Sequence, residues 1–326
     1  MGLLDIKPHQ VSRDLRGYSV FLYGAPKTGK TTTACQFPGA LLLAFEKGYS
    51  TIPGVYPVPI NTWSEFKKLF IEFKDPAVQE KFQTIIMDTA DIAYALCEKF
   101  ICNRESDAKH DYQTVADIPY GKGYAMAMDE FDECIRKILQ LGYGLVLISH
   151  EQDKVMKNER GEEYNQLIPT LDKRARLVCE RTCDIIGYCR GIEDEHGAKS
   201  VRMFMRETNR FVAGSRFKYT PDSIELTYDN LVKAISDAID EQERVNKGST
   251  TTASYNMHTE EIQYDFEALM KEVQSIVGGL MTTRPETEHK IVSIVDKHLG
   301  KGRKVSDCTP DQAALVDLII ADLKLL

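Results

Sequence analysis

The sequence has 326 residues, of which 43% are apolar, and this is enough for one large domain with its own core and a smaller one. Its formal net charge of −8 excludes a general attraction to nucleic acid, so a site for a polyanion has to be a local basic patch. We expect no membrane contact, because no apolar run approaches the roughly 20 residues that span a bilayer. The eight scattered cysteines and the lack of a secretory leader lead us to expect a cytoplasmic protein.

Before residue 247, apolar runs of strand length alternate with helical patterns. Strands are expected at 19–23, 40–45, 84–88 and 144–149, and helices at 31–36, 64–73, 90–102 and 124–141. Runs that are apolar on both faces are typical of a parallel sheet that helices cover on each side, so we expect an α/β fold. Two further strand-like stretches, 184–191 and 199–207, predict an antiparallel extension of the sheet.

Small polar residues at 247–256 predict a flexible linker, which divides the chain into a core at 1–246 and a C-terminal part at 257–326. Three helical stretches in the C-terminal part, roughly 260–277, 285–299 and 310–325, predict a small helical domain. Residues that favour helix starts precede them, namely Thr259, Pro285 and Thr309.

A phosphate-binding motif lies at residues 24–31, which match the pattern G-x-x-x-x-G-K-[ST] at every fixed position. The motif follows an expected strand and precedes an expected helix, so its backbone amides can face phosphates while Lys30 reaches the terminal ones. We therefore expect ATP and Mg²⁺ as ligands. The residues expected to bind the nucleotide are Gly24, Ala25, Pro26, Lys27, Thr28, Gly29, Lys30, Thr31 and Thr32.

A magnesium-bound triphosphate requires a carboxylate at the end of a nearby strand, and Asp88 ends the apolar run 84–88. We expect Asp88 and Thr31 to be the metal ligands. Asp91 is a second carboxylate, for which capping or solvation of the following helix is the simpler explanation.

Hydrolysis also requires a group that activates water, and Glu46 follows another buried run at the edge where α/β proteins bind ligands. The alternative is a solvent-facing side chain that pairs with Lys47. His150 ends the fourth strand and is either a sensor of the terminal phosphate or a capping or buried histidine.

Two segments are candidates for contact with a nucleic acid. Residues 151–166 are polar and predict a mobile loop, in which Lys154, Lys157 and Arg160 could contact phosphates or simply be solvated. Residues 199–218 form the most basic stretch of the core, and strand alternation places Arg202 and Arg206 on one face.

Arg216 and Lys218, at the end of the basic stretch, suggest a further role. Their "GSRFK" segment resembles the basic pair that ring and filament ATPases insert into a neighbouring subunit's nucleotide site, where a cation stabilises the transferring phosphoryl group. Nucleic-acid contact and solvated charge remain open as alternatives for this stretch.

Taken in this order, the motifs resemble those of phage-encoded RecA-like nucleotide-binding proteins, AAA-type P-loop ATPases of the single-strand annealing recombinase family that keep only the RecA core. The resemblance covers about residues 15–245 and is carried by "GAPKTGKTT", "LLLAFEKG", "TIIMDTAD", "YGKGY", "LVLISHEQDK" and "AGSRFK". It implies an ATPase that binds single-stranded DNA, cooperates with single-strand-binding protein and assembles as a filament or ring during phage replication in a bacterial host.

The resemblance also implies roles for single residues. Lys30 and Thr31 would contact phosphate and magnesium, Asp88 would be the Walker B acid and Glu46 the catalytic glutamate, His150 the phosphate sensor, and Arg216 with Lys218 the cations that act in a neighbouring subunit. Two other classes use the same phosphate loop, a small-molecule kinase and a nucleotide-switched scaffold that hardly hydrolyses. DNA-stimulated hydrolysis would distinguish the recombinase from both.

Overall fold

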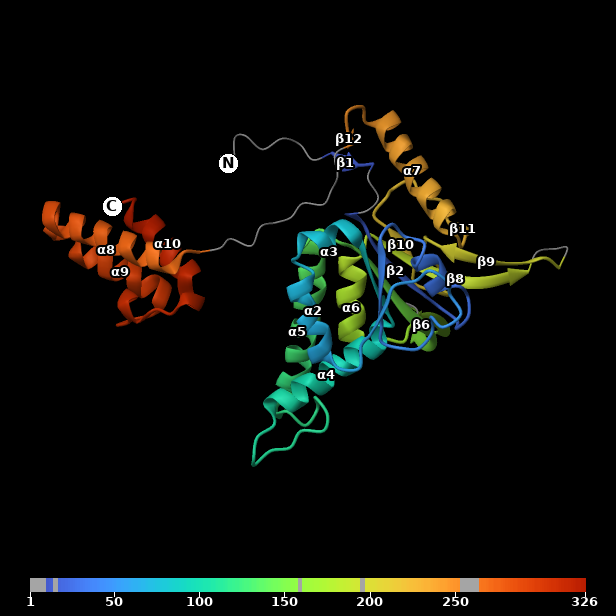
Figure 1. The fold of residues 1–326 in the computed structure, drawn as a ribbon, viewed down its shortest axis with the longest axis horizontal. Helices are drawn as coiled ribbons and strands as arrows, with labels where there is room; N and C mark the ends of the chain where they lie inside the picture. Colours follow the sequence, from blue (N-terminus) through green and yellow to red (C-terminus); the bar gives the residue numbers. More distant parts are fainter. Residues whose placement is uncertain (1–9, 14–16, 158–159, 194–196, 253–263) are drawn as a thin grey trace. The chain divides into compact units, whose positions relative to one another are not determined.

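The computed structural model describes residues 10–13, 17–157, 160–193, 197–252 and 264–326 (Figure 1). The chain divides into two compact units, Met1–Thr259 and Glu260–Leu326, each with its own apolar core. Within the described ranges, no helix has the length and apolar character needed to cross a bilayer.

Unit 1 is built on a ten-stranded sheet. Its main path runs in the order β11 (Ser223–Glu225), β9 (Lys199–Phe204), β8 (Ile185–Glu193), β2 (Ser19–Gly24), β6 (Gly144–Lys157), β5 (Thr84–Asp88), β3 (Ala40–Ala44) and β4 (Pro57–Pro59). The strands from β8 to β4 pair in parallel, whereas β9, β10 (Gly214–Ser215) and β11 extend the sheet in the antiparallel sense. The predicted mainly parallel sheet with an antiparallel extension is confirmed.

Helices cover both faces of this sheet because alternate residues of the central strands point to opposite sides. On one side, Phe21, Ile85 and Leu147 pack with α2 (Trp63–Glu72), α4 (Ala90–Glu105), α5 (Lys122–Gln140) and α6 (Lys173–Thr182). On the other side, their strand neighbours pack with α1 (Lys30–Ala34) and α7 (Tyr228–Val245). Figure 1 shows the first group and α7 on opposite sides of the sheet. The short helix α3 (Pro76–Lys81) and the 3₁₀ turn Pro119–Gly121 lie in connections.

The prediction of a mobile loop at 151–166 is wrong. Strand β6 continues without interruption through Lys157 and pairs with β7 (Glu163–Pro169), so this segment is a β-hairpin. Lys157 lies opposite Glu163 in the register, and their side chains form an ion pair at 3.4 Å. Most residues of 151–166 are polar, so the segment lacks the apolar alternation that predicts a strand.

Part of the expected linker belongs to unit 1. Residues Thr250–Thr251 form β12, which pairs in parallel with β1 (Val11–Ser12). Glu243 of α7 fixes this turn of the chain, because its carboxylate accepts hydrogen bonds from the backbone amides of Gly248 at 2.7 Å and Thr250 at 3.1 Å.

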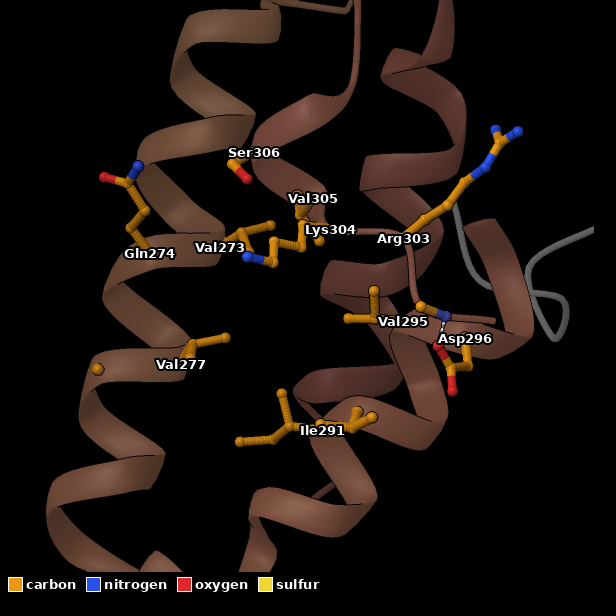
Figure 2. A pocket seen from close by; sticks show the side chains of 13 residues that line it. Val273, Gln274, Val277, Ile291, Val295, Asp296, Arg303, Lys304, Val305 and Ser306 are labelled. Carbon is orange, nitrogen blue, oxygen red and sulfur yellow. Dashed lines mark hydrogen bonds between the residues drawn. The ribbon is translucent and has the colours of Figure 1, made fainter. Parts of the chain in front are cut away.

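Unit 2 contains α8 (Phe266–Thr283), α9 (Glu288–Leu299) and α10 (Ala313–Leu323), joined by 3₁₀ turns at Pro285–Thr287, Val305–Asp307 and Pro310–Gln312. The expected start at Thr259 lies outside the described residues, and Asp265 caps α8 instead. Thr309 forms the expected cap, as part of a capping box with Gln312. Apolar residues of α10 form the most buried part of the core of unit 2. An open hollow lies between α8 and α9 (Figure 2).

Candidate nucleotide-binding site

The phosphate-binding motif forms a tight loop between the end of β2 and the start of α1. Gly24, Lys27 and Gly29 have φ angles of 151°, 65° and 87°, which glycine adopts readily and lysine does not. Gly24 also lies against β8, because a Cβ atom at this position would be 2.0 Å from the carbonyl oxygen of Cys189. No larger residue fits there, so the loop depends on glycine for both its curl and its contact with the sheet.

Lys30 lies across this loop and is 5% exposed. Its ammonium group donates hydrogen bonds to the carbonyl oxygens of Gly24 at 2.9 Å and Ala25 at 2.8 Å, and to the hydroxyl of Thr28 at 3.3 Å. Burial lowers the pKa of Lys30, and the negative groups around it, including Asp88 and Glu46, oppose this change. A charged amine held inside a loop of this curvature is suited to bind phosphate oxygens.

Thr31 and Asp88 meet beside the loop. The Thr31 hydroxyl donates to Asp88 Oδ2 at 2.7 Å, although β6 lies between the strands β2 and β5 that lead to them. Asp88 is 3% exposed, and its second oxygen, Oδ1, has no hydrogen-bond partner among the described residues. Burial raises the pKa of Asp88 to about 6. The hydrogen bond from Thr31 lowers this pKa, and the nearby negative charge of Glu46 raises it further. A buried carboxylate with a free oxygen next to a hydroxyl fits the oxygen ligands that Mg²⁺ prefers.

Glu46 and His150 lie beside Asp88, at the edge formed by the carboxyl ends of the parallel strands. The backbone amide of Glu46 donates to the carbonyl oxygen of Asp88 at 3.2 Å, and the side-chain carboxylate of Glu46 lies 3.7 Å from His150 Nε2. His150 itself pairs with Gly24 in the register of β6 and β2. Within the described ranges Lys47 forms no ion pair with Glu46, so the simple surface pairing considered for this glutamate is absent. Both Glu46 and His150 are 31% exposed in their side chains and thus accessible to a ligand.

Gly48 keeps the space between the two carboxylates open. A Cβ atom there would lie 3.3 Å from Glu46 Oε1 and 3.9 Å from Asp88 Oδ2. Both carboxylates therefore border the same short stretch of backbone. A side chain at this position would intrude beside them.

The sequence did not predict a hydrogen-bonded cluster next to His150, formed by Asp91, Ser149 and Thr170. Asp91 accepts a hydrogen bond from the Thr170 hydroxyl at 2.6 Å, and this hydroxyl lies 3.1 Å from that of Ser149. The backbone amide of Thr170 donates to the carbonyl oxygen of His150 at 3.0 Å. Thr170, which directly follows β7, thus joins Asp91 of α4 to Ser149 and His150 of β6. Only the hairpin, which sequence patterns did not predict, could have revealed this contact.

Arg216 lies at the amino ends of the parallel strands, whereas the phosphate loop lies at their carboxyl ends. Its guanidinium group pairs with Asp184 at 2.9 Å and also donates to the carbonyl oxygen of Arg181. Asp184 accepts from the amide of Ser19, where β2 begins, whereas the phosphate loop follows the end of β2 at Gly24. A strand of six residues is roughly 17 Å long, so Arg216 is too far away to act in its own chain's site. Lys218, two residues on, lies over the ring of Tyr219.

The remaining basic candidates fall into two groups. Lys154 and Lys157 lie on β6 within the hairpin, and Arg160 follows in its turn. Arg202 and Arg206 are already used inside the protein, since Arg202 donates to the carbonyl oxygen of Ser223 at 2.8 Å and Arg206 to that of Lys218 at 2.7 Å. Arg202 lies on β9 and Arg206 just beyond its end, and both arginines are bound to neighbouring backbone.

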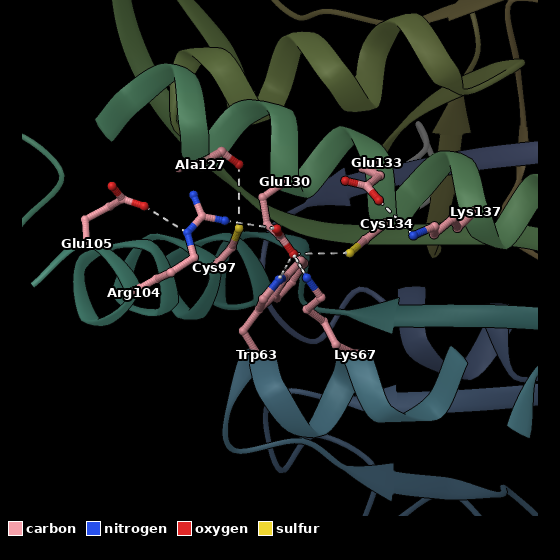
Figure 3. Close-up of polar contacts among 10 residues, drawn as sticks. All are labelled: Trp63, Lys67, Cys97, Arg104, Glu105, Ala127, Glu130, Glu133, Cys134 and Lys137. Carbon is pink, nitrogen blue, oxygen red and sulfur yellow. Dashed lines mark hydrogen bonds and ion pairs between the residues drawn. The ribbon is translucent and has the colours of Figure 1, made fainter. Parts of the chain in front are cut away.

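A further buried carboxylate, Glu130 of α5, belongs to a structural network (Figure 3). Its Oε1 atom accepts a hydrogen bond from Trp63 at 3.0 Å and pairs with Lys67 at 2.7 Å, and Oε2 lies 3.7 Å from Arg104. Burial acts to raise the pKa of Glu130, but the bonds from Lys67 and Trp63 outweigh it, so the pKa is lowered overall. Glu130 joins α2, α4 and α5, and its partners in the described structure are separate from the nucleotide edge.

A phosphate loop, its buried lysine and a hydroxyl–carboxylate pair at the carboxyl ends of parallel strands define a P-loop NTPase, and its mainly parallel sheet is covered by helices on both faces, as the sequence predicted. The chain belongs to the AAA domain family, which matches residues 16–217. It is 30% identical, over an alignment 333 positions long, to the SPbeta prophage-derived uncharacterized protein YorG of Bacillus subtilis (strain 168), and the alignment covers 98% of each chain.

Among solved structures, the chain is similar to a KaiC-like protein, PH0186, from the hyperthermophilic archaeon Pyrococcus horikoshii OT3. The identity is 13% and the TM-score is 0.33, over 60% of this chain and 80% of that one.

Proposed function

We propose that the protein is an ATP-dependent recombinase of phage origin that binds single-stranded DNA and promotes annealing or homologous recombination in the cytoplasm of a bacterial host. The observation that carries the ATPase part is the contact between Thr31 and Asp88, with Glu46 and His150 on the same edge. The similarity to a prophage-derived protein over 98% of the chain supports the phage origin.

In this proposal each side chain at the edge has a separate task. Lys30 binds the terminal phosphates, and Thr31 and Asp88 would hold Mg²⁺, which when bound neutralises charge on the phosphates. Glu46 accepts a proton from the attacking water, and His150 donates a hydrogen bond to the terminal phosphate. Replacing a general base lowers turnover by about 10²–10⁴-fold, which is the loss expected for Glu46→Gln.

The hairpin offers a route from nucleotide to DNA. Strand β6 runs unbroken from His150 to Lys157, so a change in the position of His150 is passed to the hairpin that carries Lys154. We propose that Lys154, Lys157 and Arg160 contact the phosphate backbone of single-stranded DNA. Arg202 and Arg206 could join them only after leaving their present carbonyl partners.

The position of Arg216 supports assembly from head to tail. A cation on the edge opposite the phosphate loop can reach the nucleotide of a neighbouring subunit when the two edges meet, and repetition of that contact gives a filament or a ring. In such an assembly Arg216 and Lys218 would stabilise the transferring phosphoryl group. Arg216 would first exchange Asp184 for phosphate, because this structure holds it on Asp184.

The test is ATP hydrolysis with and without single-stranded DNA, for the wild-type protein, Lys30→Ala and Glu46→Gln. We expect DNA to stimulate turnover and both variants to lose it. Binding to single-stranded oligonucleotides should strengthen with a non-hydrolysable ATP analogue and weaken with salt. Addition of single-strand-binding protein tests the expected partner.

Each competing function gives a different result. A nucleotide-switched scaffold would bind ATP but turn it over slowly with or without DNA. A small-molecule kinase would transfer phosphate saturably to a nucleoside. Unchanged hydrolysis in Lys30→Ala would refute the site itself.

A further inference from the structure

An apolar hollow of about 670 Å³ opens between α8 and α9 of unit 2. Val273 and Val277 of α8 face Ile291 and Val295 of α9 across it (Figure 2). Val273 and Ile291 are 6% and 7% exposed and belong to the core of the unit, whereas Val292 at the rim is 53% exposed. An apolar lining of this size that remains open to water is typical of a surface that binds a ligand or another protein.

A basic loop, residues 301–304, borders one end of the hollow. Asp296 of α9 accepts a hydrogen bond from the amide of Gly302 at 2.8 Å and so holds the loop against the helix. Figure 2 shows Lys304 reaching over the apolar lining toward Val273. Arg303 also borders the hollow, but its guanidinium group points away from it. Within residues 264–326, neither of these two cations forms an ion pair with a carboxylate. An ammonium group placed over an apolar surface is suited to a carboxylate that arrives with apolar side chains.

We propose that this hollow binds a short acidic peptide of a partner protein. Apolar side chains of the peptide fill the space between α8 and α9, and its carboxylates pair with Lys304. The volume lies within the range of roughly 300–1,000 Å³ that is usual for ligand sites, and it holds a few apolar side chains rather than a whole domain.

The charge of the loop favours an acidic partner over a second copy of this chain. A two-fold contact through the hollow would bring one patch against the same patch of the other copy, and with it two basic loops. Like charges facing each other oppose such a contact. The proposal is independent of the nucleotide site, because its test requires neither ATP nor DNA.

The experiment measures fluorescence anisotropy of a labelled peptide with the full-length chain. The probe is a synthetic peptide with leucines at helical spacing and a cluster of aspartates at one end. We expect saturable binding that weakens as the salt concentration rises. Lys304→Glu should weaken binding by about tenfold or more, since the substitution places like charges together. Arg303→Glu is the matched control, because it makes the same change of charge on a side chain directed away, and it should weaken binding by about twofold or less.

A third variant, Val292→Asn, tests the apolar half of the site without adding a charge. Val292 is exposed, so the fold should tolerate the change, which circular dichroism checks, and binding should fall by about tenfold or more.

Four results would overturn the proposal. They are no saturable binding, equal binding of a peptide with lysines in place of the aspartates, equal losses in Lys304→Glu and Arg303→Glu, and a self-association of the chain that Val292→Asn abolishes. The last result would assign the hollow to a second copy.

Discussion

The buried carboxylate of Asp88 should make the nucleotide-free protein less stable at neutral pH than in mild acid. Burial raises its pKa from 3.8 to about 6, so the folded state binds the proton more tightly than the unfolded chain does. For a carboxylate whose pKa is raised on folding, stability falls as the pH rises from the unfolded to the folded value and stays low above it. The pKa difference of about 2 corresponds to about 3 kcal/mol.

The substitution Asp88→Asn removes this charge and keeps an oxygen that can accept the hydrogen bond from Thr31. We expect the variant to be more stable than the wild type at neutral pH by about 2–3 kcal/mol, and the difference to disappear near the unfolded pKa. Urea unfolding with chelator present and nucleotide absent measures this, with Trp63 as the reporter. Trp63 is the single tryptophan of the chain and is 1% exposed, so its emission follows the core of unit 1.

Equal stability of the two proteins at neutral pH would refute this reasoning, and so would a wild-type stability that rises through the same pH window. Magnesium and ATP provide a second check. They should stabilise the wild type more than the variant, because Asp88 would hold the metal and the amide would not.

Two further predictions concern charge in the core of unit 1 and packing at the phosphate loop. Glu130→Gln should destabilise the protein by about 1–2 kcal/mol at neutral pH, because the carboxylate that pairs with Lys67 loses its charge. The difference should shrink in acid, because the pKa of Glu130 is lowered on folding, and a difference that does not vary with pH would contradict this. Gly24→Ala should lower the free energy of unfolding by about 2–3 kcal/mol and abolish ATP binding, because the new Cβ would meet the backbone of Cys189. Gly54→Ala is the control: its φ is 76° and the space around it is open, so it should lower the free energy of unfolding by only about 1 kcal/mol. Urea unfolding compares the two variants, and equal losses would exclude the clash as the cause.

The nucleotide edge was predictable because three of its residues follow apolar runs. Parallel strands end at one edge, so Glu46, Asp88 and His150 had to approach one another once the runs were recognised as parallel strands. The contact between Asp91 and Thr170 could not be predicted in this way. Its residues are 79 positions apart and meet through a hairpin whose strands are polar, and polar strands leave no apolar alternation to detect.

The same limit applies to Arg216. Its segment suggested a cation that acts on a neighbour, but only the sheet topology places it at the edge remote from the phosphate loop. The order of strands, with β6 between β2 and β5, follows from long-range pairing that no local pattern contains.

The pairing of β1 with β12 has a consequence for how this chain can be rearranged. Because Val11 and Thr250 are partners in the same short ladder, the polypeptide enters and leaves the ATPase body at one place. A body whose entry and exit coincide can exchange its appended module, or accept new termini elsewhere, without rethreading the sheet. A different module can therefore follow β12 without a change in the strand order of unit 1.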